Sequence, residues 1–204
     1  MKFWLIGLGW LVAAVALGLS GMLRYVRPPG PQLIIFGLTA ALIVAYWSGG
    51  PFRNWLKTLD LRAIVALHLT RFVGFYFLWL YGRGELPYRF AVPGGWGDII
   101  VATTATILLA SWSGFGGRRS VLFIWNVYGL ADILFVVATA AAAGRAEPAS
   151  MAALLRLPLS LLATFLVPLI IGSHLLIFAK LRGLAAPTAI TNADRRSPGA
   201  GREG

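Results

Sequence analysis

Long apolar runs separated by short polar connections are the dominant pattern of this chain. A helix needs about 20 mostly apolar residues to cross a bilayer. The runs that approach this length predict spans at 3–22, 32–48, 63–81, 98–113, 120–143 and 157–179. Two of them hold one charged residue in their interior, Arg71 and Asp132. The pattern therefore predicts an all-α fold, a polytopic transmembrane helix bundle of about six spans within residues 1–182.

The connections and the chain end are rich in polar residues, glycine and proline. Residues 82–98 should form irregular backbone in the outer interface, with Asp98 as the N-cap of the fourth span. Residues 183–204 are small, polar and basic, which predicts a disordered cytoplasmic tail. The first apolar run could also belong to a signal peptide, but its length of about 20 residues favours a retained helix.

Composition supports a membrane protein and excludes several kinds of site. Hydrophobic residues make up 58% of the 204 residues and charged residues 12%, about half the charged share of a soluble domain. The chain has no cysteine, which excludes disulfides, iron–sulfur clusters and thiolate zinc sites. Its two histidines, His68 and His174, limit histidine-based metal chemistry to one site. The sequence shows no nucleophile–base constellation or phosphate loop, and an enzymatic activity stays open.

Basic residues are distributed unevenly among the connections, and the net charge is +11 at pH 7. With a cytoplasmic N-terminus, eleven Lys and Arg fall on the cytoplasmic side and six on the other. This positive-inside asymmetry predicts a bacterial inner membrane protein with both termini in the cytoplasm. Basic residues beside spans contact anionic lipid, so the predicted partner is the lipid bilayer and not nucleic acid. A homodimer or a membrane partner protein is a further alternative.

Five polar side chains fall inside the predicted spans: His68, Arg71, Asn126, Asp132 and His174. A charged side chain near mid-bilayer costs about 2.5–3.5 kcal/mol, so such residues face the bundle interior and find partners. At about 1.5 Å per residue from the nearest cytoplasmic basic residue, both histidines lie about 9 Å deep and Asn126 about 10.5 Å. On the same scale Arg71 lies about 13.5 Å and Asp132 about 19.5 Å deep. We therefore expect one shared polar layer and an Arg71–Asp132 ion pair, with a protonated Asp132 as the alternative.

Three functions are compatible with this intramembrane polar cluster. In a non-catalytic scaffold or assembly factor, its hydrogen bonds would join helices, at about 0.6 kcal/mol each. In an electron carrier, His68 and His174 would ligate the iron of a b-type haem, with Arg71 near the propionates. In a proton- or ion-coupled transporter of small solutes, titration of Asp132 against Arg71 would couple protons to a conformational change. The sequence does not decide among these three functions.

Four motifs support a resemblance to a family. The third span contains H-x-x-R-x-x-G-x-x-F (His68, Arg71, Gly74 and Phe77), and P-G-G-W-G-D (93–98) comes before the fourth span. The fifth span contains W-N-x-x-G-x-x-D (Trp125, Asn126, Gly129 and Asp132). The sixth contains L-P-L-x-L-L-A-T-F-L-V-P-L (157–169), followed by S-H-L-L (173–176). Over residues 67–182 the chain resembles a family of small, uncharacterised bacterial integral membrane proteins. The resemblance implies that the polar cluster belongs to the family pattern, and it does not include the first two spans.

Overall fold

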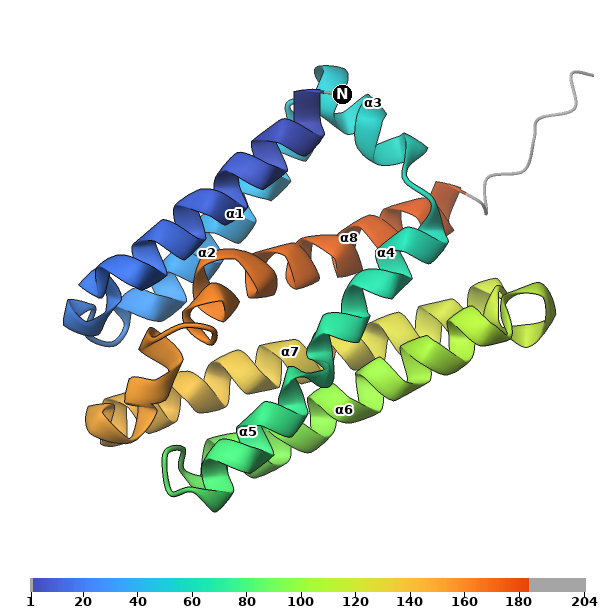
Figure 1. The fold of residues 1–204 in the computed structure, drawn as a ribbon. Coiled ribbons are helices and arrows are strands. Elements are labelled where there is room, and N and C mark those ends of the chain that lie inside the picture. Colours follow the sequence, from blue (N-terminus) through green and yellow to red (C-terminus); the bar gives the residue numbers. More distant parts are fainter. Residues whose placement is uncertain (1, 184–204) are drawn as a thin grey trace, which may run out of the picture.

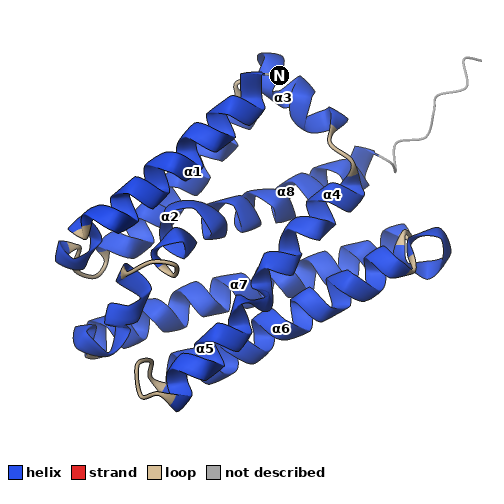
Figure 2. Cartoon of the chain, in the orientation of Figure 1, coloured by secondary structure: helices blue, strands red, loops and turns tan. Residues whose placement is uncertain are grey.

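The computed structural model describes residues 2–183, which fold into helices joined by short connections, with no strand in this part of the chain (Figures 1 and 2). The predicted tail lies outside the described residues except for Gly183, where the last helix ends. In order, the elements are α1 (Lys2–Ser20), η1 (Met22–Tyr25), α2 (Gly30–Trp47), α3 (Gly50–Thr58), α4 (Leu61–Leu67), η2 (His68–Phe72), α5 (Val73–Gly82), α6 (Tyr88–Ala110), η3 (Trp112–Gly116), α7 (Arg119–Ala146), η4 (Pro148–Leu155), η5 (Leu162–Leu166) and α8 (Val167–Gly183).

Six helical stretches are long and apolar enough to cross a membrane. They are α1, α2, the continuous α4–η2–α5, α6, α7, and η5 with α8. This confirms the predicted all-α fold with six candidate spans, and the chain is an integral membrane protein by the length and apolar character of these helices. Large apolar side chains remain exposed along them, as expected where lipid is the solvent.

The fourth span differs from the prediction, because α6 begins at Tyr88 and not at Asp98. The Pro- and Gly-rich segment is therefore largely helical, and Asp98 lies inside the helix, not at its N-cap. Close packing against α5 explains the glycines. A Cβ atom on Gly95 would lie 2.9 Å from the carbonyl oxygen of Gly74, and one on Gly74 would lie 2.3 Å from that of Gly95. Tertiary contact thus outweighs the low helix propensity of glycine.

A further difference from the prediction is α3, a nine-residue helix after the second span. Gly49 precedes it and Gly50 is its first residue, with φ values of 78° and 71°, and a positive φ favours glycine. Its aromatic side chains Phe52 and Trp55 pack on Phe3, with ring centroids 5.5 and 5.4 Å apart. A short helix with apolar and basic faces is typical of the membrane interface.

The spans divide into a packed group and a peripheral hairpin (Figure 1). In α6, 50% of the span is buried, against 6% in α1 and 11% in α2. α2 packs against α8, and α1 reaches η5, where the indole of Trp10 donates a hydrogen bond to the carbonyl of Thr164 over 2.8 Å. Two apolar clusters fill the packed group at its two ends, one around Val65 and Leu122 and the other around Phe77 and Val136. The polar residues lie in the layer between these clusters.

Candidate functional site

The third span changes its helical geometry where its polar residues occur. Residues 68–72 form the 3-10 helix η2 between the α-helices α4 and α5. In a 3-10 helix the side chains at i and i+3 lie directly above one another, so His68 and Arg71 point to the same side. Both are buried, with 0% and 1% of their surface exposed. A 3-10 stretch inside a longer helix often marks a hinge or a functional position.

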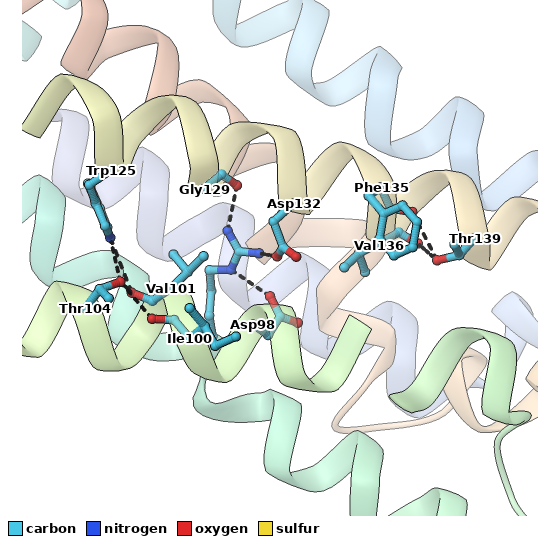
Figure 3. A network of polar contacts seen from close by, with 11 residues as sticks. Asp98, Ile100, Val101, Thr104, Trp125, Gly129, Asp132, Phe135, Val136 and Thr139 are labelled. Atoms are coloured by element: carbon cyan, nitrogen blue, oxygen red, sulfur yellow. Dashed lines mark hydrogen bonds and ion pairs between the residues drawn. The ribbon is translucent and has the colours of Figure 1, made fainter. Parts of the chain in front are cut away.

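Arg71 is the centre of a buried ionic group that joins three spans. Its Nε donates to Oδ1 of Asp98 on α6 over 2.6 Å, and its Nη1 donates to the carbonyl oxygen of Gly129 on α7 over 2.9 Å. Its Nη2 donates to Oδ2 of Asp132, also on α7. Figure 3 shows these three acceptors around one guanidinium. We call Asp98, Arg71 and Asp132 the acid–base triad.

The triad holds more acid than base. Two carboxyl groups face one guanidinium, and the exposed fractions of the three side chains are 1% for Arg71, 4% for Asp98 and 10% for Asp132. With both carboxyl groups ionised, the triad has a net charge of −1 in a medium of low dielectric constant, where an uncompensated charge is costly. Uptake of one proton by either carboxylate makes the triad neutral. The arrangement can therefore bind and release a proton.

The two histidines lie beside the triad and are held by neutral partners. His68 Nε2 lies 3.1 Å from Ser173 Oγ, whose hydroxyl donates to the carbonyl of Ile170 over 2.7 Å. His174 Nδ1 lies 2.7 Å from Oδ1 of Asn126, and the Asn126 amide donates to the backbone carbonyl of His174 over 3.0 Å. These partners place the proton of His68 on Nε2 and that of His174 on Nδ1. The other ring nitrogens, His68 Nδ1 and His174 Nε2, are buried and have no hydrogen-bond partner among residues 2–183.

The arrangement of the histidines does not fit the predicted haem. Their ring centroids are 4.3 Å apart, and Trp125 packs its edge against His68 at 4.9 Å. These are contact distances for aromatic rings, so no flat macrocycle fits between them. Gly129 closes the opposite side, since a Cβ there would lie 2.7 Å from Cε1 of His174. The described residues also include no group of three or more His, Cys, Asp and Glu side chains that could hold a metal ion.

A cavity of about 410 Å³ adjoins the triad. Arg71 and Asp98 line its inner end, and mainly apolar side chains of α2, α5, α7 and α8 line its walls. Three arginines of the connections line its mouth, Arg24, Arg27 and Arg156. Its volume lies within the range of about 300–1,000 Å³ that is usual for ligand pockets. The cavity therefore connects one end of the bundle with the buried ionic group.

The structure brings together all five residues of the predicted polar cluster. The expected ion pair between Arg71 and Asp132 is present, and the histidines and Asn126 share one layer. What this cluster does stays a prediction. Asp98, the second acid of the triad, was interpreted as a helix cap. Val101 and Ala102, three and four residues after Asp98, are apolar and buried. Residues at these spacings share one face of a helix, and this could have indicated that Asp98 faces the interior.

Comparison with known proteins gives a family without an assigned function. Residues 28–182 match the domain of unknown function DUF8737. No curated protein matches the chain, and no solved structure does. The match includes the second span, which the resemblance in the sequence had left out. The chain belongs to the DUF8737 family.

Proposed function

We propose that the protein is a proton-coupled transporter of a small solute, and that the acid–base triad is its proton-binding site. The observation that supports this is the second carboxylate beside a single buried guanidinium. Ionisable residues inside a membrane are costly and mark proton relays and substrate pathways. A group that only joined helices would need one acid to balance one base.

Asp132 is the carboxylate that exchanges the proton in this proposal. It is the more exposed of the two acids, at 10% against 4% for Asp98. A proton on Asp132 neutralises the triad and weakens its bond to Nη2, whereas Asp98 and the Gly129 carbonyl continue to hold Arg71. Proton uptake thereby weakens one of the two bonds between the Arg71 guanidinium and α7. Since η2 has the weaker hydrogen-bond geometry of a 3-10 helix, it is the segment whose conformation changes when Asp132 takes up the proton.

The cavity supplies a place for the solute in this proposal. Arg71 and Asp98 belong to its lining, so a bound molecule and the proton act on the same charged group. A proton that changes the charge of the triad also changes the electrostatic environment of the cavity's inner end. The proton site and the solute site can therefore be coupled through this shared group alone.

Proton movement in vesicles tests the proposal. We expect vesicles of phosphatidylglycerol and phosphatidylcholine that contain the purified protein to acidify when a potassium diffusion potential is imposed, as followed with an enclosed pH-sensitive dye. Asp132→Asn should abolish the acidification, because an amide has no exchangeable acid proton. Glu147→Gln removes an exposed carboxyl group beyond the end of α7 and should leave the rate unchanged.

Infrared difference spectra between low and high pH then localise the proton. The wild type should show the C=O band of a protonated carboxyl group, and Asp132→Asn should lack it. If neither acidification nor this band depends on Asp132, the proposal fails. The triad would then only hold the spans together. The three hydrogen bonds that Arg71 donates through Nε, Nη1 and Nη2 are compatible with this structural role.

The orientation of the chain follows from its basic residues. We propose a bacterial inner membrane with both termini in the cytoplasm, so that the cavity mouth faces outward. Because the chain has no cysteine, a single introduced cysteine reports on which side of the membrane a connection lies. Ala146→Cys, at the exposed end of α7, should react with a membrane-impermeant maleimide in intact cells. Ser113→Cys, between α6 and α7, should react only after permeabilisation, and the reverse pattern would contradict this orientation.

A further inference from the structure

The mouth of the cavity carries positive charge that nothing in the described chain neutralises. Arg24 and Arg27 lie in the connection between α1 and α2, and Arg156 follows η4. All three are exposed and line the cavity. Among residues 2–183, none of them forms an ion pair with a carboxylate. Three guanidinium groups at one opening are a favourable site for phosphate, which they bind through charge-assisted, bidentate hydrogen bonds.

The inner end of the cavity has the opposite character. Arg71 is the only basic residue of the lining at this depth, and two carboxylates already hold it. An anionic group placed there would approach Asp98 and gain no free positive charge. The charge distribution therefore favours an anion at the mouth and an uncharged portion of the ligand further in.

The wall between the two ends is apolar and elongated. Ile133, Val136, Ala140 and Gly144 line it from one face of α7, at successive spacings of three and four residues. From the first to the last of these, the helix rises about 16.5 Å. The opposite wall includes Leu159, Leu162 and Ala163. A long, narrow apolar space of this kind accommodates a hydrocarbon chain.

A buried polar atom near the mouth adds a further contact. Gln32, in the first turn of α2, lines the cavity, and its buried Oε1 has no hydrogen-bond partner in the described part of the chain. A buried acceptor without a donor is unfavourable. A hydroxyl group on the ligand, close to its anionic part, would satisfy it.

We propose that the cavity binds a phospholipid with an anionic, hydroxyl-bearing headgroup. Its phosphate contacts Arg24, Arg27 and Arg156, and one acyl chain extends along α7 toward the triad. This inference deepens the proposed function, because it names the class of the transported solute. Binding itself does not require proton coupling, so the two can be tested separately.

Native mass spectrometry of the purified full-length protein in detergent tests the binding. The probes are dioleoyl phosphatidylglycerol and dioleoyl phosphatidylcholine, which share acyl chains and differ in headgroup. We expect the wild type to retain phosphatidylglycerol about tenfold more strongly, because the arginines repel the choline cation of the other lipid, and phosphatidylglycerol instead has hydroxyl groups. Excess inorganic phosphate should not displace the lipid; displacement would overturn the placement of the acyl chain.

Two variants test the two ends of the site. Exchange of the three mouth arginines, Arg24, Arg27 and Arg156, for glutamine should remove the headgroup preference. Ala140→Phe fills the apolar space and should reduce retention of both lipids. The matched controls are a triple Arg→Gln variant at three exposed arginines that do not line the cavity (Arg62, Arg118 and Arg119), and Ala138→Phe on the exposed face of α7. Each control should behave like the wild type.

The outcomes separate this inference from the proposed function. Equal retention of the two lipids by the wild type, or an equal loss in the control triple variant, would show general lipid contact and overturn the site. If Ala140→Phe does not yield folded protein, the arginine triple variant still decides the headgroup contact. A wild type that binds this lipid but moves no proton would refute the coupling and leave the lipid site intact.

Discussion

Replacing Arg71 by methionine should destabilise the protein more than any other single exchange of a polar residue. The substitution leaves Asp98 and Asp132 buried without a cation, and loss of one partner from a buried ion pair costs about 3–5 kcal/mol. We expect a large fall in the yield of monodisperse protein and in its melting temperature, both measured in detergent. Because the group joins η2, α6 and α7, three of the six spans lose a common contact.

A compensated variant and an exposed ion pair provide the controls. Arg71→Met combined with Asp98→Asn and Asp132→Asn removes all three charges and should recover much of the lost stability, since uncharged groups of similar volume are tolerated in place of a buried ion pair. Arg83→Met breaks an ion pair with Glu85 whose side chains are 57% and 44% exposed. Such surface pairs contribute about 0–1 kcal/mol, so little change is expected. Equal melting temperatures for Arg71→Met and Arg83→Met would contradict the central role of the triad.

Gly74→Ala should have the second largest effect. The new methyl group would lie 2.3 Å from the carbonyl oxygen of Gly95 and 3.1 Å from Cβ of Asp98. No side-chain rotation relieves a contact with backbone, so α5 and α6 must separate, and overpacking of this kind costs about 1–3 kcal/mol. The melting temperature should fall, and the separation should also disturb the bond from Arg71 to Asp98.

Gly82→Ala is the matched control on the same helix. Among the described residues, a Cβ on Gly82 would have no atom within 4 Å outside its own stretch of helix, so this variant should melt like the wild type. If Gly74→Ala and Gly82→Ala proved equally stable, the close approach of α5 and α6 would not be required for the fold. Both variants are also informative in the proton-movement assay, since only the first should alter it.

The proposed proton site and the proposed lipid site have complementary charges. Protonation of the triad removes its net negative charge, whereas the arginines at the mouth stay positive. A lipid phosphate at the mouth is therefore held in both protonation states, and the inner end of the cavity changes with the proton. The site on which proton and solute act jointly is the inner end, where Arg71 and Asp98 line the cavity.

The sequence by itself determined the number of candidate spans and predicted the pairing of Arg71 with Asp132, which the structure contains. Apolar length decides which segments can cross a bilayer, and the fixed rise of a helix converts sequence position into depth. The same counting placed His68, Asn126 and His174 in one layer, where the structure finds them in contact. Apolar length and depth depend on one helix at a time, and so they can be read without knowledge of the packing.

Only the tertiary structure decided where Asp98 lies and whether a haem fits between the two histidines. Glycine and proline before Asp98 locally favour irregular backbone, but the approach of Gly74 to Gly95 stabilises a helix that places this carboxylate beside Arg71. Equal depth likewise left open how far apart His68 and His174 lie. Their ring contact and the adjoining cavity depend on how helices pack sideways, a property that no single segment contains.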